Sequence, residues 1–149
     1  MKKGGMLNAK LLGALAELRH LDSVVICDAG FPVPKGANLI DISLVAYLPT
    51  FDQTLKAVLN ELIFEKYIIF DFMKDYNPEA YAMVHEMMPA QECEEIPMVP
   101  DFLERCKEAK LFIRTGELRP CSNIMLVSAS GVESACKPLD VSFELTITP

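Results

Sequence analysis

The chain has 149 residues, of which 51% are hydrophobic and 23% are charged, and its formal net charge is −7. This length and apolar content predict one globular domain, residues 1–149, with a sizeable core, and they exclude a disordered chain. The lysines and arginines occur singly or in pairs and form no basic cluster, which argues against nucleic acid or an anionic membrane surface as a partner.

The lack of targeting signals in the sequence and the pattern of its cysteines both predict a cytoplasmic protein. No apolar run reaches the roughly 18 residues that a membrane span needs. The start of the chain, Lys2 and Lys3 followed by two glycines, lacks the apolar core of a signal peptide. The five cysteines are odd in number and show no C-x-x-C spacing, so we expect reduced thiols in the cytoplasm and no structural zinc site.

The spacing of apolar residues predicts helices and strands that alternate along the chain. In order, we expect a helix over 8–20, strands over 23–27 and 39–42, a helix over 51–64, a strand over 67–72, a helix over 78–88, a strand over 95–99, a helix over 102–109, and strands over 111–114, 123–128 and 141–147.

Helix starts are marked by capping residues, namely Asn8, Thr50 and the pair Asn77-Pro78. Residues 141–147 alternate strictly between apolar and polar, which is typical of a strand with one wet face. Together the elements predict an α/β fold. We expect a three-layer sandwich with a mainly parallel central sheet, helices on both faces and an antiparallel C-terminal strand.

The strongest candidates for chemistry are His20 and Asp28. His20 closes the first predicted helix, and Asp28 stands at the exit of the strand over 23–27. Histidine titrates at about pH 6.5 and suits general acid or base catalysis, and open α/β sheets bind ligands where their strands end. On two successive elements that pack together, the pair would form a pocket for moving protons on a small polar molecule. A helix-terminal histidine and a turn-forming aspartate remain the plainer interpretations.

Other candidates carry weaker signals. His85 lies among methionines on a helix and is expected to be packed or on the surface. Cys121 precedes a strand and could be an accessible nucleophile if a neighbouring base lowered its pKa. Glu65, Asp71 and Asp75 form a loose acidic cluster of a kind that is usually solvated. The sequence has no glycine-rich phosphate loop, so we expect no nucleotide cofactor, and we expect no metal.

Several blocks of the sequence stand out together: residues 1–8, His20-x-Asp22 with residues 25–35, Pro49-Thr50-Phe51, Asn77-Pro78, and residues 113–117 and 122–126. In these blocks, which extend over most of residues 1–132, the chain resembles the D-ribose pyranase / L-fucose mutarotase family of cytoplasmic sugar-handling proteins. The first block and the Thr-Gly-Glu…Asn-Ile block are the most specific. The tail, residues 132–149, is an extension beyond the resemblance.

The resemblance implies roles for three residues. The family's histidine that matches His20 is the catalytic acid, the aspartate that matches Asp28 binds sugar, and the asparagine that matches Asn123 adds a contact. It also implies ring-like assemblies, typically decamers, with each sugar site at a subunit boundary, and the use of neither metal nor cofactor.

Three positions depart from the family pattern. Arg19 stands where a glycine is usual, Cys121 stands at the tyrosine position, and Val99 stands where ribose-type members have a histidine. The segment 102–105 is more similar to the fucose branch, whereas the start of the chain is more similar to the ribose branch.

We therefore expect a monosaccharide mutarotase or pyranase, an isomerase for free L-fucose first and D-ribose second. His20 would transfer the proton, Asp28 would orient it or a sugar hydroxyl, and Asn123 would hold another hydroxyl. The alternative is a non-catalytic sugar-binding or transporter-associated regulatory protein on the same scaffold, which Cys121 and Val99 motivate. A subunit with a decayed site would neither bind nor exchange a sugar.

Overall fold

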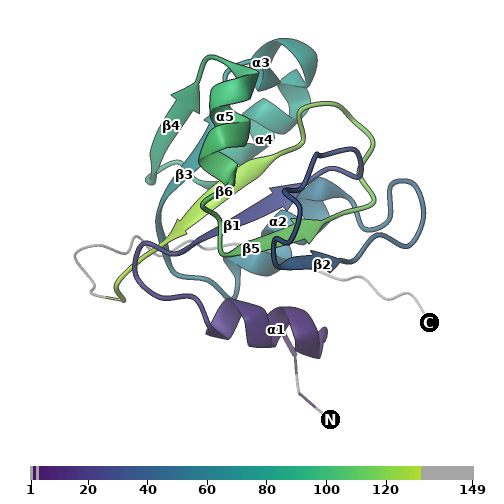
Figure 1. Ribbon diagram of the computed structural model, residues 1–149, viewed down its shortest axis with the longest axis vertical. Coiled ribbons are helices and arrows are strands. Elements are labelled where there is room, and N and C mark those ends of the chain that lie inside the picture. The colour runs from purple at the N-terminus through teal and green to yellow at the C-terminus, as the bar shows by residue number, and fades with distance from the viewer. Residues whose placement is uncertain (1, 3, 132–149) are drawn as a thin grey trace.

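A computed structural model describes residue 2 and residues 4–131 of the chain. The six strands of this part form one sheet in the order β2-β5-β1-β6-β3-β4 (Figure 1). In chain order the elements are α1 (Ala9–Ala16), β1 (Ser23–Cys27), β2 (Leu39–Asp41), α2 (Phe51–Leu59), β3 (Phe64–Phe70), α3 (Met73–Tyr76), α4 (Pro78–Met87), β4 (Glu92–Ile96), α5 (Val99–Cys106), β5 (Leu111–Arg114) and β6 (Ile124–Ser128).

The sheet is mainly parallel, with one strand reversed. β5 lies parallel to both β1 and β2, and β3 lies parallel to β4. β6 is antiparallel to both of its neighbours, β1 and β3, although it lies inside the sheet. All of its residues are buried, so its sequence shows no alternation that could reveal its direction. The predicted fold class is confirmed; the predicted strand over 141–147 lies outside the described residues.

Helices cover both faces of the sheet, as Figure 1 shows. Strand β1 marks the division, because its side chains alternate between two cores. Val24 and Ile26 belong to the core that also contains residues of α1, α2 and α4, whereas Val25 and Cys27 belong to the core that contains residues of α5. A strand buried on both faces accounts for the continuous apolar run in the sequence.

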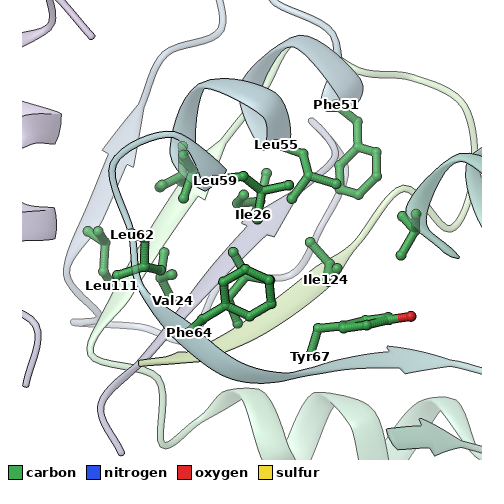
Figure 2. Close-up of a cluster of buried hydrophobic side chains, with 14 of the residues drawn as sticks. Val24, Ile26, Phe51, Leu55, Leu59, Leu62, Phe64, Tyr67, Leu111 and Ile124 are labelled. Carbon is green, nitrogen blue, oxygen red and sulfur yellow. The ribbon is translucent and has the colours of Figure 1, made fainter. Parts of the chain in front are cut away.

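The larger core lies beneath α2, which contributes Phe51, Leu55 and Leu59 (Figure 2). The core on the other face is built around Phe102 of α5. Its ring centroid lies 5.2 Å from that of Phe70 at the end of β3 and 6.4 Å from that of Phe31. Phe31 belongs to the loop that follows Asp28, so α5 helps to fix that loop.

The three predicted helix caps are confirmed. Asn8 accepts the Leu11 N–H, Thr50 forms a capping box with Gln53, and Asn77 caps α4. No helix in the described part of the chain is long and apolar enough to cross a membrane.

Helix α2 ends five residues earlier than predicted, at Leu59. Leu62 and Phe64 continue the apolar spacing of the helix, which misleads a prediction from periodicity alone. In the structure they are buried as turn and strand residues, and Phe64 already begins β3. The predicted strand over 67–72 is therefore displaced to Phe64–Phe70.

Elements near β4 also differ from the prediction. β4 occupies Glu92–Ile96 rather than 95–99, because its acidic residues conceal an edge strand that has little apolar pattern. Helix α5 begins at Val99 rather than at residue 102, with Pro100 in its first turn. The short helix α3 (Met73–Tyr76) was not expected.

Candidate functional site

Two predicted site residues and one long loop meet at a single edge of the sheet. The parallel strands β1 and β5 end at this edge, and the antiparallel β6 starts there. Asp28 follows β1, Asn123 precedes β6, and the loop 115–122 connects β5 to β6. Open α/β sheets bind ligands outside such an edge.

Asp28 and Asn123 are in direct contact. The Asn123 Nδ2 group donates to Asp28 Oδ2 at 2.8 Å, and Asn123 Oδ1 accepts the Asp28 backbone N–H at 3.0 Å. The other carboxylate oxygen, Asp28 Oδ1, accepts the Gly30 N–H at 2.9 Å. Burial raises the pKa of Asp28, while the hydrogen bonds from Asn123 and Gly30 oppose that increase.

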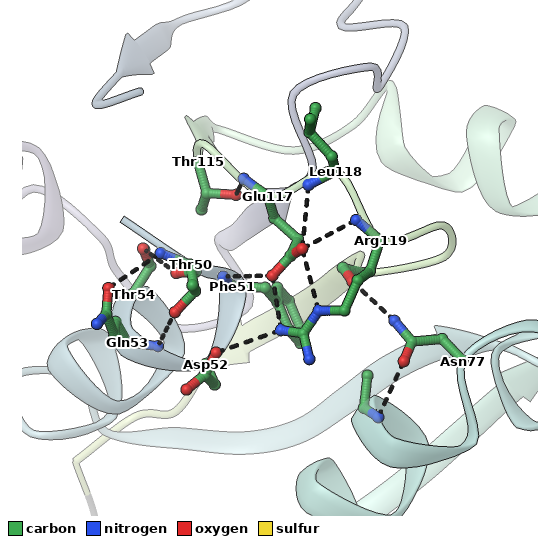
Figure 3. A network of polar contacts seen from close by, with 12 residues as sticks. Thr50, Phe51, Asp52, Gln53, Thr54, Asn77, Thr115, Glu117, Leu118 and Arg119 are labelled. Carbon is green, nitrogen blue, oxygen red and sulfur yellow. Dashed lines mark hydrogen bonds and ion pairs between the residues drawn. The ribbon is translucent and has the colours of Figure 1, made fainter. Parts of the chain in front are cut away.

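An ion pair between a buried carboxylate and a partly exposed arginine shapes the loop 115–122 (Figure 3). Glu117 is fully buried, and its carboxylate accepts hydrogen bonds from the Arg119 side chain at 2.6 and 3.0 Å and from the Phe51 N–H at 3.3 Å. Burial by itself raises the pKa of Glu117, but Arg119 and the backbone donors outweigh it and lower the pKa to about 2. The Glu117 carbonyl also accepts the Ala29 N–H at 2.9 Å, which joins the loop to the residues after β1.

The first two residues of this loop fix its path out of β5. The N–H and hydroxyl of Thr115 both donate to the Cys27 carbonyl, at 3.0 and 2.9 Å. Gly116 lies directly against the backbone of the segment 45–49, where a Cβ would approach backbone atoms to within 2.5 Å. No side chain fits at this position without displacing that segment.

Asn77 supports the other end of the loop from α4. Its Oδ1 accepts the Ala80 N–H at 3.2 Å, which caps the helix. Its Nδ2 donates to the Pro120 carbonyl and to the Ser122 hydroxyl, each at 3.0 Å. One residue therefore starts a helix and holds the turn just before Asn123.

Cys121 lies beside the candidate site in a left-handed backbone conformation, with φ at 61°. Its carbonyl accepts the Asn123 N–H at 2.9 Å. Burial raises the pKa of the Cys121 thiol, and the charge of Asp28 raises it further. An activated thiol needs the opposite shift, so the structure gives no support to Cys121 as a nucleophile.

His20 lies at the other end of β1 from Asp28. The five strand residues between them rise about 3.3 Å each, which separates the two residues by roughly 16 Å along the strand. Within one chain they do not form the pocket expected of two successive elements, because the intervening strand is extended. The His20 side chain is 51% exposed, and its Nε2 lies 3.3 Å from Glu65 Oε2.

The acidic cluster seen in the sequence separates in the fold. Glu65, near the start of β3, pairs with His20, whereas Asp71, just after β3, pairs with Lys74. The sequence suggests only a solvated acidic cluster for Glu65, because its partner His20 lies 45 residues away in the chain. A pocket of about 430 Å³ opens beside Glu65 and is also lined by Leu21, Ser23, Lys66, Glu92, Arg105, Glu108, Met125 and Val127.

His85 is part of a separate group of side chains on α4 and β4. Its Nδ1 lies 2.9 Å from the Tyr67 hydroxyl oxygen. With Cys93 and Glu95 it forms the one group in the described part of the chain whose ligand atoms could hold a metal ion.

Comparisons with known proteins agree on the family. Residues 1–132 match the model of the RbsD / FucU transport protein family. D-ribose pyranase 1 of Rubrobacter xylanophilus is 38% identical over 128 residues, which cover 85% of this chain and 95% of that protein. The structure of Bacillus subtilis RbsD complexed with D-ribose is 40% identical with a TM-score of 0.82, and the match covers 87% of this chain and 98% of that one.

A second solved structure shares the fold at lower identity. The fucose mutarotase of Streptococcus pneumoniae, in complex with L-fucose, is 23% identical with a TM-score of 0.72, and the match covers 85% of this chain and 95% of that one. The family match over 132 residues and the D-ribose pyranase relative confirm the resemblance seen in the sequence. The chain therefore belongs to the RbsD / FucU transport protein family.

Proposed function

We propose that the protein is a D-ribose pyranase, an isomerase that interconverts ring forms of free D-ribose without a cofactor. The Rubrobacter xylanophilus relative carries that name, and the Bacillus subtilis structure at 40% identity is complexed with D-ribose. The observation that carries the proposal is the contact between Asp28 and Asn123, whose carboxylate and amide lie at the edge of the sheet where ligands bind.

D-ribose is preferred to L-fucose, which reverses the order expected from the sequence. That expectation depended on the short segment 102–105. The likeness to the fucose mutarotase of Streptococcus pneumoniae, at 23% identity, concerns the fold alone. The relative at 38% identity is named D-ribose pyranase 1, and the solved structure at 40% identity is complexed with D-ribose.

Interconversion of ring forms breaks and re-forms one C–O bond, and proton transfers are the steps that the protein has to assist. A base removes the proton of the anomeric hydroxyl, the bond between C1 and the ring oxygen breaks as the C1 carbonyl forms, and an acid protonates the ring oxygen. Closure reverses these steps with the same or another hydroxyl as the attacking group, so protons and electrons balance. A positioned acid or base contributes about 10²–10⁴-fold to such a step.

We assign the proton transfers to His20, with Glu65 as its positioning residue. The carboxylate of Glu65 lies 3.3 Å from Nε2 and restricts the orientation of a half-exposed ring. Asp28 and Asn123 are assigned to sugar hydroxyls. Each oxygen of Asp28 already accepts one hydrogen bond and has capacity for another, and the Asn123 amide has a second N–H to donate.

Each site is proposed to form between two copies of the chain, because His20 and Asp28 lie at opposite ends of β1. His20 of one copy would approach Asp28 and Asn123 of the next. Exposed apolar side chains around the same edge, Leu44, Val45, Tyr47, Leu48 and Leu118, offer surface for such a contact. Such a contact joins one face of a copy to a different face of the next, and head-to-tail contacts of this kind form a ring when the rotation between copies closes. We propose the ring-like decamer as the assembly.

A non-catalytic sugar-binding or regulatory protein is the second candidate. It is favoured by Cys121, which offers no phenol to a sugar at the family's tyrosine position. It is also favoured by Val99, which is 41% exposed at the start of α5 and has no ring nitrogen to offer. Such a protein would bind D-ribose and leave its exchange rate unchanged.

Saturation-transfer NMR of D-ribose tests the proposal, because it measures the exchange between pyranose and furanose forms directly. We expect the protein to accelerate exchange and the His20→Ala variant to lose about 10²–10⁴-fold of the acceleration. Calorimetric titration of both proteins with D-ribose provides the control for binding. Binding without accelerated exchange by the parent protein would favour the second candidate, and an unchanged rate in His20→Ala would remove His20 from the mechanism.

Mixed assemblies test the shared site. The His20→Ala and Asp28→Asn variants are each expected to be inactive alone. After equal amounts are unfolded and refolded together, about a quarter of the sites should combine an intact His20 with an intact Asp28 from the neighbouring copy. Activity near that fraction supports a site between copies, whereas no recovery in assemblies that light scattering shows to be mixed would contradict it.

A further inference from the structure

Three side chains of different chemistry converge between α4 and the edge strand β4. His85 lies in the last turn of α4, and Cys93 and Glu95 are alternate residues of β4, so their side chains point to the same face of the strand. The ligand atoms of the three residues all lie within 4.8 Å of one another. The sequence predicts no zinc site because these residues are dispersed along the chain, but the fold brings them together.

Tyr67 on β3 lies beside two of these groups. Tyr67 is paired with Cys93 in the parallel ladder, and its hydroxyl oxygen lies 2.9 Å from His85 Nδ1. If the His85 Nδ1–H donates to this oxygen, His85 Nε2 retains a free lone pair. Metal-ligating histidines are held by such contacts at the nitrogen that does not bind the metal.

His85 Nε2 is the atom that this arrangement leaves free. It is buried, and it has no hydrogen-bond partner among the described residues. The carboxylate oxygen Glu95 Oε1 lies 3.7 Å away, too far for a hydrogen bond, and already accepts the Tyr81 hydroxyl at 2.7 Å. A buried ring nitrogen without a partner, in a group whose ligand atoms lie within 4.8 Å of one another, fits the geometry of a metal ligand.

The local charge also favours a cation. Glu95 brings one negative charge into the group and a Cys93 thiolate would bring a second, so a bound cation would balance both. Glu94 itself points away from the group and pairs with Lys66 at 3.0 Å.

We propose that His85, Cys93 and Glu95 bind a zinc ion. One imidazole nitrogen, one thiolate and one carboxylate form a set of borderline ligands that suits zinc and does not suit calcium or magnesium, which prefer oxygen. Bonds of about 2.0–2.3 Å in a tetrahedral arrangement put ligand atoms roughly 3.3–3.8 Å apart, so the side chains close by about 1 Å on binding. Water completes the coordination, and the ion joins the edge strand β4 to α4.

Metal binding is tested on the full chain after dialysis against a chelator. Calorimetric titration with zinc chloride is expected to give one ion per chain, and cobalt(II) is expected to give the charge-transfer absorption of a thiolate ligand. Zinc should also protect Cys93 from alkylation by iodoacetamide, with each cysteine followed separately by mass spectrometry. Calcium and magnesium chloride should give no such protection.

Variants separate this site from other thiols and from the proposed sugar site. Cys93→Ser and His85→Gln should each weaken zinc binding by about 100-fold or more, and Tyr67→Phe by about 10-fold to 100-fold. Glu94→Gln, the neighbouring carboxylate on the opposite face of β4, should change it by less than about 3-fold. His20→Ala should bind zinc as the parent does, so failure of the proposed function leaves this test intact. Zinc binding that survives both Cys93→Ser and His85→Gln, or no binding at micromolar concentrations, would overturn the proposal.

Discussion

Asp28 and Asn123 exchange two hydrogen bonds of opposite direction, although 95 residues separate them in the chain. The backbone N–H of Asp28 donates to the Asn123 side chain, and the Asn123 side chain donates to the Asp28 carboxylate. This arrangement needs an acceptor-only group at position 28 and a group with both donor and acceptor at position 123. It therefore explains why a carboxylate and an amide occupy these positions, independently of any ligand.

The first prediction exchanges the two side chains. Asp28→Asn puts one amide N–H₂ against another, and Asn123→Asp puts one carboxylate against another, so each single variant should lose about 1–3 kcal/mol in the free energy of unfolding. In the double variant the amide at 28 donates to the carboxylate at 123, and every contact to Gly30 and the backbone is kept. The double variant should recover most of the loss in urea denaturation.

The same double variant separates structure from function. It restores the hydrogen bonds but moves the negative charge from position 28 to position 123. If Asp28 binds the sugar as proposed, D-ribose exchange should remain impaired in the refolded double variant. Recovery of both stability and exchange would mean that the carboxylate at 28 is needed only for the fold.

The second prediction concerns Glu117 and pH. Its pKa of about 2 lies below the ordinary value of 4.5, so its stabilising effect is complete above pH 4.5 and is lost as the pH falls toward 2. The shift corresponds to about 3 kcal/mol. Glu117→Gln should lower the free energy of unfolding by about that amount at neutral pH, and the difference from the parent should shrink in acid.

Urea denaturation at about pH 7, 4 and 3, at one protein concentration, measures this difference. Glu61→Gln is the matched control, because Glu61 faces Lys2 at the surface and its loss should cost less than about 1 kcal/mol. A difference between parent and Glu117→Gln that stays constant over this range would contradict the assigned role of the Glu117–Arg119 pair.

The third prediction compares two glycines. Gly116→Ala introduces a Cβ within 2.5 Å of the backbone of segment 45–49 and should destabilise the protein by about 1–3 kcal/mol. Gly13→Ala, in the middle of α1 with no atom within 4 Å of the new Cβ, should stabilise it by about 0.5–1 kcal/mol. Hydrogen exchange should show faster exchange of the Tyr47 amide, which donates to the Gly116 carbonyl, in the first variant only. Equal effects of the two substitutions would contradict the close approach at Gly116.

Local signals in the sequence were sufficient for the starts of α1, α2 and α4 and for the buried strand β1. Asn8, Thr50 and Asn77 each cap a helix by accepting a backbone N–H three residues further along the chain. The continuous apolar run 23–27 indicates directly that this strand is buried on both faces. The end of α2 could not be read in the same way, because Leu62 remains apolar whether the chain is helical or turning.

Relationships between distant segments could not be predicted from single residues. Eight positions separate His20 from Asp28, and that spacing suggests proximity until an extended strand between them is taken into account. Glu117 resembles an ordinary loop residue, and only the fold shows that its carboxylate is buried and accepts hydrogen bonds from Arg119 and the Phe51 N–H. His85 has no neighbour in sequence that would mark it as a ligand.

The last prediction isolates Glu65. If Glu65 orients His20, Glu65→Gln should slow D-ribose exchange at saturating sugar by about 10-fold, a part of the 10²–10⁴-fold that an acid or base provides. The apparent affinity for D-ribose should stay unchanged, because Glu65 acts through His20. NMR exchange measured over a range of ribose concentrations separates the two quantities.

A double-variant cycle distinguishes positioning from general support of the fold. In the His20→Ala background, Glu65→Gln should have no further effect, because the ring that it orients is gone. Glu61→Gln, a surface carboxylate at the end of α2, should leave the rate unchanged in either background. A 10-fold loss that persists without His20 would show that Glu65 acts on the fold or directly on the sugar, and the role of His20 would then have to be argued without it.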